Sequence, residues 1–152
     1  MNFTDFNLDN RIQEGISSLG FEKATAIQEH AIPVILEGKD LIASAQTGTG
    51  KTAAFLLPII HKILTYTHDD CIKAMVIVPT RELAVQIDQH LDGLSYFTSV
   101  SSIAVYGGGD GIVFERTKKA LTDGVDIIIC TPGTMISHLN MGYMNLSGLK
   151  YL

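Results

Sequence analysis

The fold of this chain is decided by the stretch Ala45-Gln46-Thr47-Gly48-Thr49-Gly50-Lys51-Thr52, which lies between an apolar run and a helical pattern. Glycines in such a loop let the backbone N–H groups wrap around a phosphate, and the following helix directs its positive end at the same anion. Lys51 can reach the β- and γ-phosphates of a nucleotide, and the Thr52 hydroxyl can bind Mg²⁺. A glycine-rich turn that carries a lysine by chance is the alternative, but the order of strand, loop and helix matches a phosphate-binding loop.

Short apolar runs alternate with helical patterns along the rest of the chain. The runs show little polar alternation and each precedes a helical stretch, which is typical of buried parallel strands in βα units. We expect strands at 40–45, 74–78, 100–105 and 126–130, and helices over 8–19 and from about 26 to 37. Pro33 is expected to interrupt the second helix. The sequence therefore predicts an α/β fold in a single domain over residues 1–152.

Composition narrows the class of protein. With 46% hydrophobic and 18% charged residues, the 152-residue chain has the composition of a globular domain that buries a core. The longest apolar run, near 53–60, is far shorter than a membrane span, and the start of the chain lacks the basic and apolar parts of a signal peptide. Cys71 and Cys130 show no metal-ligand spacing, so we expect reduced thiols and a cytoplasmic protein without a membrane partner.

The phosphate loop departs from the general pattern at one position, since Ala45 stands where glycine is usual. The form Ala-x-Thr-Gly-x-Gly-Lys-Thr is that of DEAD-box and related superfamily 2 helicases, which this chain resembles over nearly its whole length. Segment 20–28, Gly-Phe-Glu-Lys-Ala-Thr-Ala-Ile-Gln, resembles the Q motif of DEAD-box proteins, with Phe3 as the isolated aromatic upstream. The resemblance implies the N-terminal RecA-like domain of an ATP-dependent RNA helicase, with a P-loop NTPase fold and with ATP and Mg as cofactors.

The same resemblance implies which residues bind the nucleotide. Gln28 would read adenine, because a side-chain amide offers the donor and acceptor that the N6 and N7 edge needs, and Phe3 would stack on the base. Gln28 also has a plainer interpretation, since Thr25 and Gln28 form the sequence pattern of a helix capping box, and the two roles are compatible. The expected nucleotide-binding residues are Phe3, Phe21, Gln28, Ala45, Thr47, Gly48, Thr49, Gly50, Lys51 and Thr52, of which Lys51 and Thr52 would act in catalysis.

Three further segments resemble RNA-binding motifs of the family, and each follows a predicted strand. They are 79–84 (motif Ia), 107–108 (the GG element) and 131–133 (motif Ib). Motifs Ia and Ib are equally good helix starts, but a helix N-terminus is also where an RNA phosphate can bind. At the GG element, the absent side chains would let a sugar-phosphate backbone approach closely. The resemblance implies RNA contacts by Pro79, Thr80, Arg81, Gly107, Gly108, Thr131, Pro132 and Gly133.

The net charge of −5 argues mildly against a nucleic-acid-binding protein. The objection is met if backbone N–H groups and helix N-termini make most of the phosphate contacts, which would also make binding independent of base sequence. Two residues depart from the family on this surface: Thr134 stands where arginine is usual, and Phe114 where glutamine is usual. The loss of that arginine is expected to change RNA affinity.

The five histidines show neither metal spacing nor a nucleophile partner. His30 lies in the second predicted helix, and we expect His61, His68, His90 and His138 on the surface or on a helix face. The one metal expected is therefore Mg²⁺, held with the nucleotide by Thr52.

The last residues, 149–152, resemble the lead-in to the strand that carries Asp-Glu-Ala-Asp in the family. On this resemblance, the acidic motif and the second RecA-like domain of the same chain are expected to follow. Residues 1–152 alone would then lack ATP hydrolysis and unwinding. They would also expose the edge of the 40–45 strand, through which two copies could dimerise or swap elements.

Two other functions remain open from the sequence. A superfamily 2 DNA helicase or translocase would share the phosphate loop, although the Q motif together with Pro-Thr-Arg-Glu-Leu-Ala favours RNA. A non-catalytic RNA-binding module could keep the same fold without turning over ATP. The absence of an Asp-Glu pair after residue 152 would favour the second.

Overall fold

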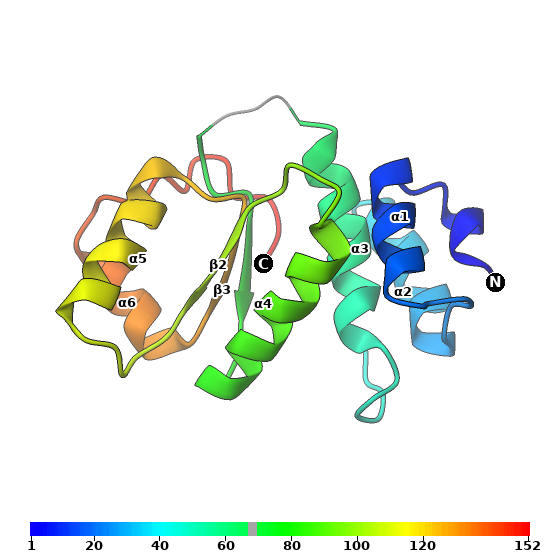
Figure 1. Ribbon diagram of the computed structural model, residues 1–152, viewed down its shortest axis with the longest axis horizontal. Helices are drawn as coiled ribbons and strands as arrows, with labels where there is room; N and C mark the ends of the chain where they lie inside the picture. Colours follow the sequence, from blue (N-terminus) through cyan, green and yellow to red (C-terminus); the bar gives the residue numbers. More distant parts are fainter. Residues whose placement is uncertain (67–69) are drawn as a thin grey trace. The chain divides into compact units, whose positions relative to one another are not determined.

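The computed structural model describes residues 1–66 and 70–152, which form two compact units (Figure 1). Among the described residues, the first unit comprises 1–66 and 90–99, and the second comprises 70–89 and 100–152. Helix α4 (Arg81–Ser95) begins in the second unit and ends in the first. His68, one of the histidines considered above, lies outside the described residues.

The first unit is helical. It contains the 3₁₀ turn η1 (Phe3–Phe6), α1 (Asn10–Ser18), α2 (Ala26–Leu36) and α3 (Lys51–Leu64). Helix α3 is apolar around most of its circumference, because it packs closely against α2 and also contacts α1. The fully buried side chains of this unit include Ile12, Ile32, Leu56, Leu57 and Ile60. They make a core that fixes the start of α3, where the phosphate loop ends.

The prediction that Pro33 interrupts the second helix is wrong. Helix α2 continues through Pro33 to Leu36, and the N–H of Glu37 still donates to the Pro33 carbonyl oxygen at 3.0 Å. A proline inside a helix removes one backbone hydrogen bond. Burial of Ala31 and Ile32 just before it keeps the helix in place.

The predicted strand at 40–45 is also wrong, since these residues form no strand. Ile42 is 103% exposed, and none of the N–H groups of residues 40–46 donates to a backbone carbonyl within the described chain. A strand exists through the hydrogen bonds that it makes with a neighbour, whatever the propensity of its residues. With no neighbouring strand among the described residues of its unit, this apolar run stays irregular.

The second unit confirms the α/β class. Its sheet contains β1 (Ala74–Ile77), β2 (Ser102–Val105) and β3 (Ile127–Cys130), all parallel, in the order β1-β3-β2. Each strand lies within one of the runs predicted from the sequence and is one or two residues shorter. Helices α5 (Gly111–Asp123) and α6 (Pro132–Asn140) connect and cover the sheet, as Figure 1 shows on its left side.

The core of the second unit lies between the sheet and these two helices. Ile128 and Cys130 point to the same face of β3, as alternate strand residues must, and pack with Leu121 of α5 and Met135 of α6. Cys130 and Cys71 are both buried and free of disulfides. Burial raises the pKa of the Cys130 thiol to about 11, so it stays protonated at neutral pH.

A polar cluster ties together the amino ends of the three strands. The Lys73 ammonium, just before β1, donates to Asp126 Oδ1 at 2.9 Å, and Asp126 Oδ2 accepts from the Ser101 N–H at 2.9 Å. Asp126 precedes β3 and Ser101 precedes β2, so one carboxylate contacts the lead-in of both outer strands. The Lys73 and Asp126 side chains are largely buried.

The chain returns to β1 near its last residues. Tyr151 forms a parallel bridge with Ala74, and its carbonyl oxygen accepts from the Met75 N–H at 2.9 Å. Since β3 occupies one side of β1, Tyr151 lies on the other. None of the helices in the described parts of the chain is long and apolar enough to span a membrane.

Candidate nucleotide and nucleic-acid sites

The phosphate loop has the backbone that its glycines predict. Gly48 has a φ of 80° and Gly50 a φ of 88°, values in the left-handed region that favours glycine. Gly50 is the N-cap of α3, a helix of 14 residues that begins with Lys51 and Thr52. The loop thus leads directly into a helix N-terminus, where free N–H groups favour an anion.

Lys51 lies over this loop. Its ammonium group donates to the carbonyl oxygens of Ala45 and Gln46, the second at 2.7 Å. The Thr49 hydroxyl also donates to the Gln46 carbonyl, at 2.7 Å. Thr52 follows in the first turn of α3 and is half-buried. The cation and the hydroxyl that a nucleotide phosphate and Mg²⁺ require are therefore next to each other at the start of one helix.

The Q-motif segment touches the phosphate loop directly. The predicted capping box of α2 is present: Gln28 Oε1 accepts from the Thr25 N–H at 2.9 Å. The same side chain turns its Nε2 to the Gly50 carbonyl oxygen at 3.2 Å, and the Thr25 hydroxyl donates to the Thr49 carbonyl at 2.8 Å. Two side chains of the segment therefore hold two carbonyl groups of the loop. Gln28 itself is 3% exposed.

The two candidate aromatic residues occupy different depths. Phe3 is 4% exposed, and its ring lies 6.3 Å from that of Phe21 with an interplanar angle of 25°. Phe6 lies on another side of Phe3, at 6.2 Å. Phe21 is 41% exposed. Phe21 is therefore the ring of this pair that is open to solvent, and the buried Phe3 ring packs against it.

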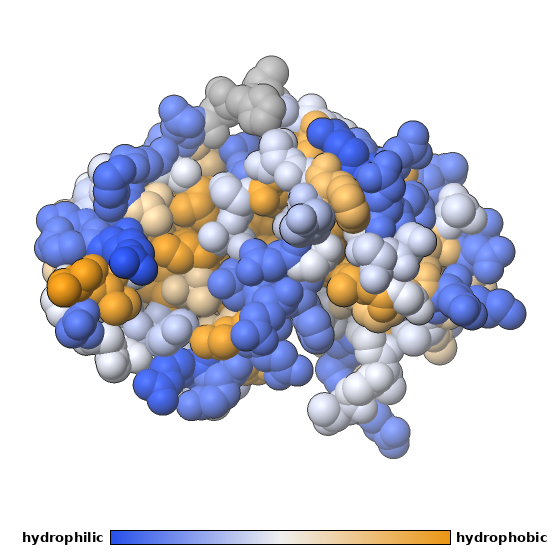
Figure 2. Space-filling model, in the orientation of Figure 1, coloured by the Kyte–Doolittle hydropathy of each residue, from blue (hydrophilic) through white to orange (hydrophobic). Residues whose placement is uncertain are grey.

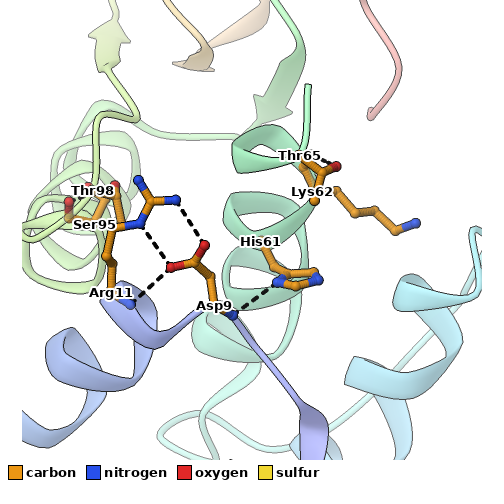
Figure 3. Close-up of polar contacts among 7 residues, drawn as sticks. All are labelled: Asp9, Arg11, His61, Lys62, Thr65, Ser95 and Thr98. Carbon is orange, nitrogen blue, oxygen red and sulfur yellow. Dashed lines mark hydrogen bonds and ion pairs between the residues drawn. The ribbon is translucent and has the colours of Figure 1, made fainter. Parts of the chain in front are cut away.

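A polar cluster anchors the N-terminal segment to α3 (Figure 3). The Asp9 N–H donates to His61 Nδ1 at 3.1 Å, while the Asp9 carboxylate caps α1 and binds the Arg11 guanidinium at 2.9 and 2.8 Å. Hydrogen bonding by Arg11 lowers the pKa of Asp9 to about 2, and burial lowers the pKa of His61. Sequence reasoning gave His61 no role beyond a helix face. Asp9 can be recognised in the sequence as a helix N-cap, but its contact with His61 joins residues 52 positions apart and leaves no local pattern.

The second unit brings the three predicted RNA-binding segments to one edge. Pro79 to Arg81 follow β1, Gly107 and Gly108 follow β2, and Thr131 to Gly133 follow β3. Because the strands are parallel, their carboxyl ends meet at the same edge of the sheet. The candidate residues there are exposed or half-buried.

The segments also contact one another. A Cβ added to Gly108, whose φ is 95°, would lie 3.0 Å from Arg81 Nη1, and one added to Gly107 would lie 3.1 Å from Thr134 Oγ1. A side chain at either position would crowd the Arg81 guanidinium or the Thr134 hydroxyl. The glycines therefore let the three loops form one surface.

Two helices begin at this edge, as expected. The Thr80 hydroxyl accepts from the Leu83 N–H at 3.3 Å at the start of α4, and Thr131 is the N-cap of α6, with Pro132 at its first position. The Arg81 guanidinium is exposed and lies 3.6 Å from the Glu82 carboxylate. Free N–H groups and a guanidinium are groups that bind phosphates.

No cluster of three or more histidine, cysteine, aspartate or glutamate side chains able to hold a metal exists in residues 1–66 and 70–152. His30 and His90 are exposed. His138 is 1% exposed and lies on the buried face of α6, where Phe114 stacks on it. The pattern of the sequence did not reveal this pair, because Phe114 and His138 lie 24 positions apart in the chain.

Comparison with known proteins gives consistent results. A family model described as DEAD/DEAH box helicase matches residues 25–152. The chain is 46% identical over 150 residues to the ATP-dependent RNA helicase CshA of Listeria monocytogenes serovar 1/2a, covering 99% of this chain and 28% of that protein. It is 43% identical over 152 residues to the ATP-dependent RNA helicase CshA of Limosilactobacillus reuteri, covering 100% of this chain and 30% of that protein.

A third relative, the DEAD-box ATP-dependent RNA helicase CshA of Bacillus cereus (strain ATCC 10987), is 40% identical over 148 residues, which cover 97% of this chain and 27% of that protein. The chain therefore spans less than a third of the length of these curated relatives. The family model, in contrast, matches most of the chain, including the phosphate loop and all three loops at the sheet edge. On this match, the chain belongs to the DEAD/DEAH box helicase family.

Proposed function

We propose that this chain forms the ATP-binding and RNA-binding part of the N-terminal RecA-like domain of an ATP-dependent RNA helicase. The observation that carries the proposal is the contact between the Q-motif segment and the phosphate loop, in which Gln28 and Thr25 bind the carbonyl groups of Gly50 and Thr49. A base-reading side chain and a phosphate cradle are thereby held as one site. The names of the CshA relatives, all RNA helicases, support the same function.

The phosphate loop would bind the triphosphate of ATP. Backbone N–H groups of Gly48 to Thr52 would face the phosphates, and Lys51 would exchange its contacts with Ala45 and Gln46 for contacts with the β- and γ-phosphates. Thr52 would hold Mg²⁺ through its hydroxyl. The ion would neutralise charge on the phosphates as the terminal one is transferred to water.

Gln28 would select adenine with the amide N–H and the oxygen lone pair that its contacts within the protein do not use. A primary amide has two N–H donors and two lone pairs on its oxygen, and the fold uses one of each, for Gly50 and Thr25. The remaining donor and lone pair suit the N7 and N6 edge of adenine, whereas guanine offers an acceptor in place of the N6 donor. Phe21 would stack on the base with its exposed face, and Phe3 would hold Phe21 in position.

RNA would bind at the carboxyl edge of the sheet in the second unit. The start of α6 at Thr131 to Gly133 and the start of α4 at Thr80 and Arg81 present free N–H groups, and Gly107 and Gly108 leave room for the sugar-phosphate backbone. Such contacts read phosphates and not bases, so binding would be largely independent of sequence. They also explain how a chain with a net charge of −5 can bind RNA.

The partner that completes this function would be a second RecA-like domain of the same protein, which closes over the nucleotide and bends the bound RNA strand. The two free, buried thiols fit a reducing cytoplasm, which is where we place the protein. In the absence of that second domain, the irregular segment 40–45, with its exposed Ile42, would be the surface through which two copies of the chain associate.

The direct test is ATP hydrolysis by the full-length protein with and without single-stranded RNA. We expect hydrolysis that requires Mg²⁺ and rises several-fold with RNA of any sequence. Equal stimulation by single-stranded DNA of the same sequence would favour a DNA translocase, because the 2′-hydroxyl would then contribute nothing. RNA binding without hydrolysis under all conditions would favour a non-catalytic module. Hydrolysis that RNA leaves unchanged would contradict the proposal.

A further inference from the structure

An aromatic cluster lies behind the candidate RNA edge in the second unit. The Phe114 and His138 rings are stacked, with centroids 4.7 Å apart and an interplanar angle of 14°. The Tyr143 ring meets His138 edge-on at 6.0 Å, and the Tyr143 hydroxyl is hydrogen-bonded to His138 Nδ1. Three segments therefore meet at one imidazole: the first turn of α5, the last turn of α6 and the chain after α6.

His138 occupies a core position of α6. Met135, one turn earlier, is buried, and His138 on the same helix face is 1% exposed. An apolar side chain would fill this place without a hydrogen-bonding requirement, whereas a buried imidazole costs free energy unless its polar atoms are paired. Tyr143 supplies the pairing, so the stack depends on a specific partner as well as on packing.

The charged and titratable groups around the stack favour a neutral imidazole. Burial lowers the pKa of His138, and no carboxylate in the described residues forms an ion pair with it. On α5, the Lys118 ammonium lies 5.7 Å from the centre of the Tyr143 ring. Burial and the Glu115 carboxylate raise the pKa of Tyr143, so its hydroxyl stays protonated in its hydrogen bond with Nδ1.

The stack connects α5, which follows the GG element, with α6, which begins at motif Ib. Phe114 lies in the first turn of α5, and His138 lies in the last turn of α6. At the edge itself, a Cβ on Gly107 would already lie 3.1 Å from Thr134 Oγ1. A small shift of α5 relative to α6 would therefore change the spacing of these two loops.

We propose that the Phe114–His138 stack, closed by Tyr143, is a positioning element that sets the spacing of the GG and motif Ib loops and thereby the affinity for RNA. The inference rests on the proposed RNA binding of this edge. His138 acts through the loops and touches no ligand. The neutral imidazole stacks on Phe114 and is hydrogen-bonded to Tyr143, whereas the protonated imidazolium carries a charge into a buried site.

RNA affinity should consequently depend on pH. An exposed imidazole has a pKa of about 6.5, and burial places that of His138 lower. The imidazole therefore binds a proton less readily in the intact stack than in an opened stack, where it would be exposed. The intact stack has its full stability above pH about 6.5 and loses stability as the pH falls toward the lowered pKa. RNA affinity should follow the same course, while ATP affinity, which depends on the other unit, should not.

The test measures RNA affinity of the full-length protein by fluorescence anisotropy with a labelled oligouridine, at several pH values between about 5.5 and 8. We expect His138→Ala to weaken binding about tenfold at pH 7.5, and Tyr143→Phe, which removes only the hydroxyl, to weaken it about threefold. His138→Phe keeps a stacked ring that cannot be protonated, and it should recover most of the affinity and remove the pH dependence. ATP affinity should be unchanged in all three variants.

His61→Gln is the matched control, because burial lowers the pKa of this imidazole too but it lies in the other unit. This variant should keep the pH dependence of RNA binding. If His138→Ala and Tyr143→Phe lower the melting temperature but bind RNA like the parent protein, the stack is a packing element only and the inference is overturned. A parent protein that binds no RNA at any pH overturns the proposed function as well, so the two failures differ.

Discussion

Gln28 and Gly50 are in direct contact, since the side-chain amide of Gln28 donates to the Gly50 carbonyl oxygen at 3.2 Å. A Cβ on Gly50 would lie 2.4 Å from the same nitrogen. The residue that reads the base in our proposal thus also supports the turn that binds the phosphates. Its two roles can be separated by measuring base selectivity and nucleotide affinity in the same variants.

Gln28→Ala should reduce the ratio of kcat/KM for ATP to that for GTP toward one, because the amide that matches adenine is lost. It should also weaken the binding of both nucleotides, since the Gly50 carbonyl loses its donor. Steady-state kinetics of the full-length protein measure both effects. Gln86→Ala, an exposed glutamine on α4, is the control. An unchanged ratio would mean that Gln28 is a capping residue alone.

Lys51→Ala should weaken ATP binding roughly tenfold to a hundredfold, the range expected for a lost charge-assisted hydrogen bond to a phosphate. Titration calorimetry with ATP and Mg²⁺ is the measurement. Lys62→Ala, on the last turn of the same helix, removes the same charge far from the loop and should bind ATP like the parent. Equal affinities in the Lys51 variant and the parent would refute the phosphate-loop assignment.

Arg81→Ala should weaken RNA binding by a similar factor for different base sequences, because a guanidinium at this edge would contact phosphates. The slope of log affinity against log salt concentration should fall by roughly 0.7 for a single strand. Charge reversal, Arg81→Glu, should have a larger effect in the same direction. Lys119→Ala on the exposed side of α5 should leave affinity and slope nearly unchanged. A loss confined to certain base sequences would argue against a phosphate contact.

Gly15→Ala should destabilise the protein even though alanine favours a helix by about 1 kcal/mol over glycine. Gly15 lies inside α1, where a Cβ would be 2.5 Å from the Leu94 carbonyl oxygen. Relieving that contact must move one helix against the other, which typically costs about 1–3 kcal/mol. Gly111→Ala, at the start of α5 with open space around it, should leave stability unchanged or raise it. Thermal melting of both variants gives the comparison, and a more stable Gly15 variant would contradict the packing.

The 152-residue chain by itself should self-associate, because Ile42 is fully exposed in a segment whose N–H groups have no backbone partner in residues 1–66 and 70–152. Size-exclusion chromatography with light scattering should show species larger than a monomer. Ile42→Lys should shift them toward the monomer, whereas Ile112→Lys, at another exposed isoleucine, should not. A single monomeric species with one cooperative melting transition would rule out association through this segment.

The sequence predicted best those features that depend on neighbours in the chain. The phosphate loop needs glycine at Gly48 and Gly50 and a helix immediately after, and the Thr25 capping box needs Gln28 three residues later. Three strands were placed to within two residues, because each lies in a short apolar run that precedes a helical stretch, and β3 is in addition buried at every residue. Their shared carboxyl edge followed from parallel pairing alone.

The features that sequence reasoning missed depend on distant residues. Segment 40–45 has the composition of a strand, but a strand also needs a neighbouring strand to pair with, and the composition of the segment does not reveal whether one is present. Phe3 has an aromatic ring suited to stacking on a base, yet burial under Phe21 is decided by how η1 folds back. His138 looked like an ordinary helix residue because Phe114, which stacks on it, lies 24 positions earlier in the chain.

The Asp126 cluster has a consequence for how the sheet finds its alignment. Strand β3 reads Ile127-Ile128-Ile129-Cys130 and is buried throughout, so a slip by one residue would mostly replace isoleucine with isoleucine. Apolar packing therefore discriminates poorly between neighbouring registers. Asp126 does discriminate, because a slip in either direction would take its carboxylate away from Lys73 and Ser101 together and leave the buried Lys73 ammonium without that carboxylate. One acidic side chain thus specifies the register in which β3 pairs with β1 and β2.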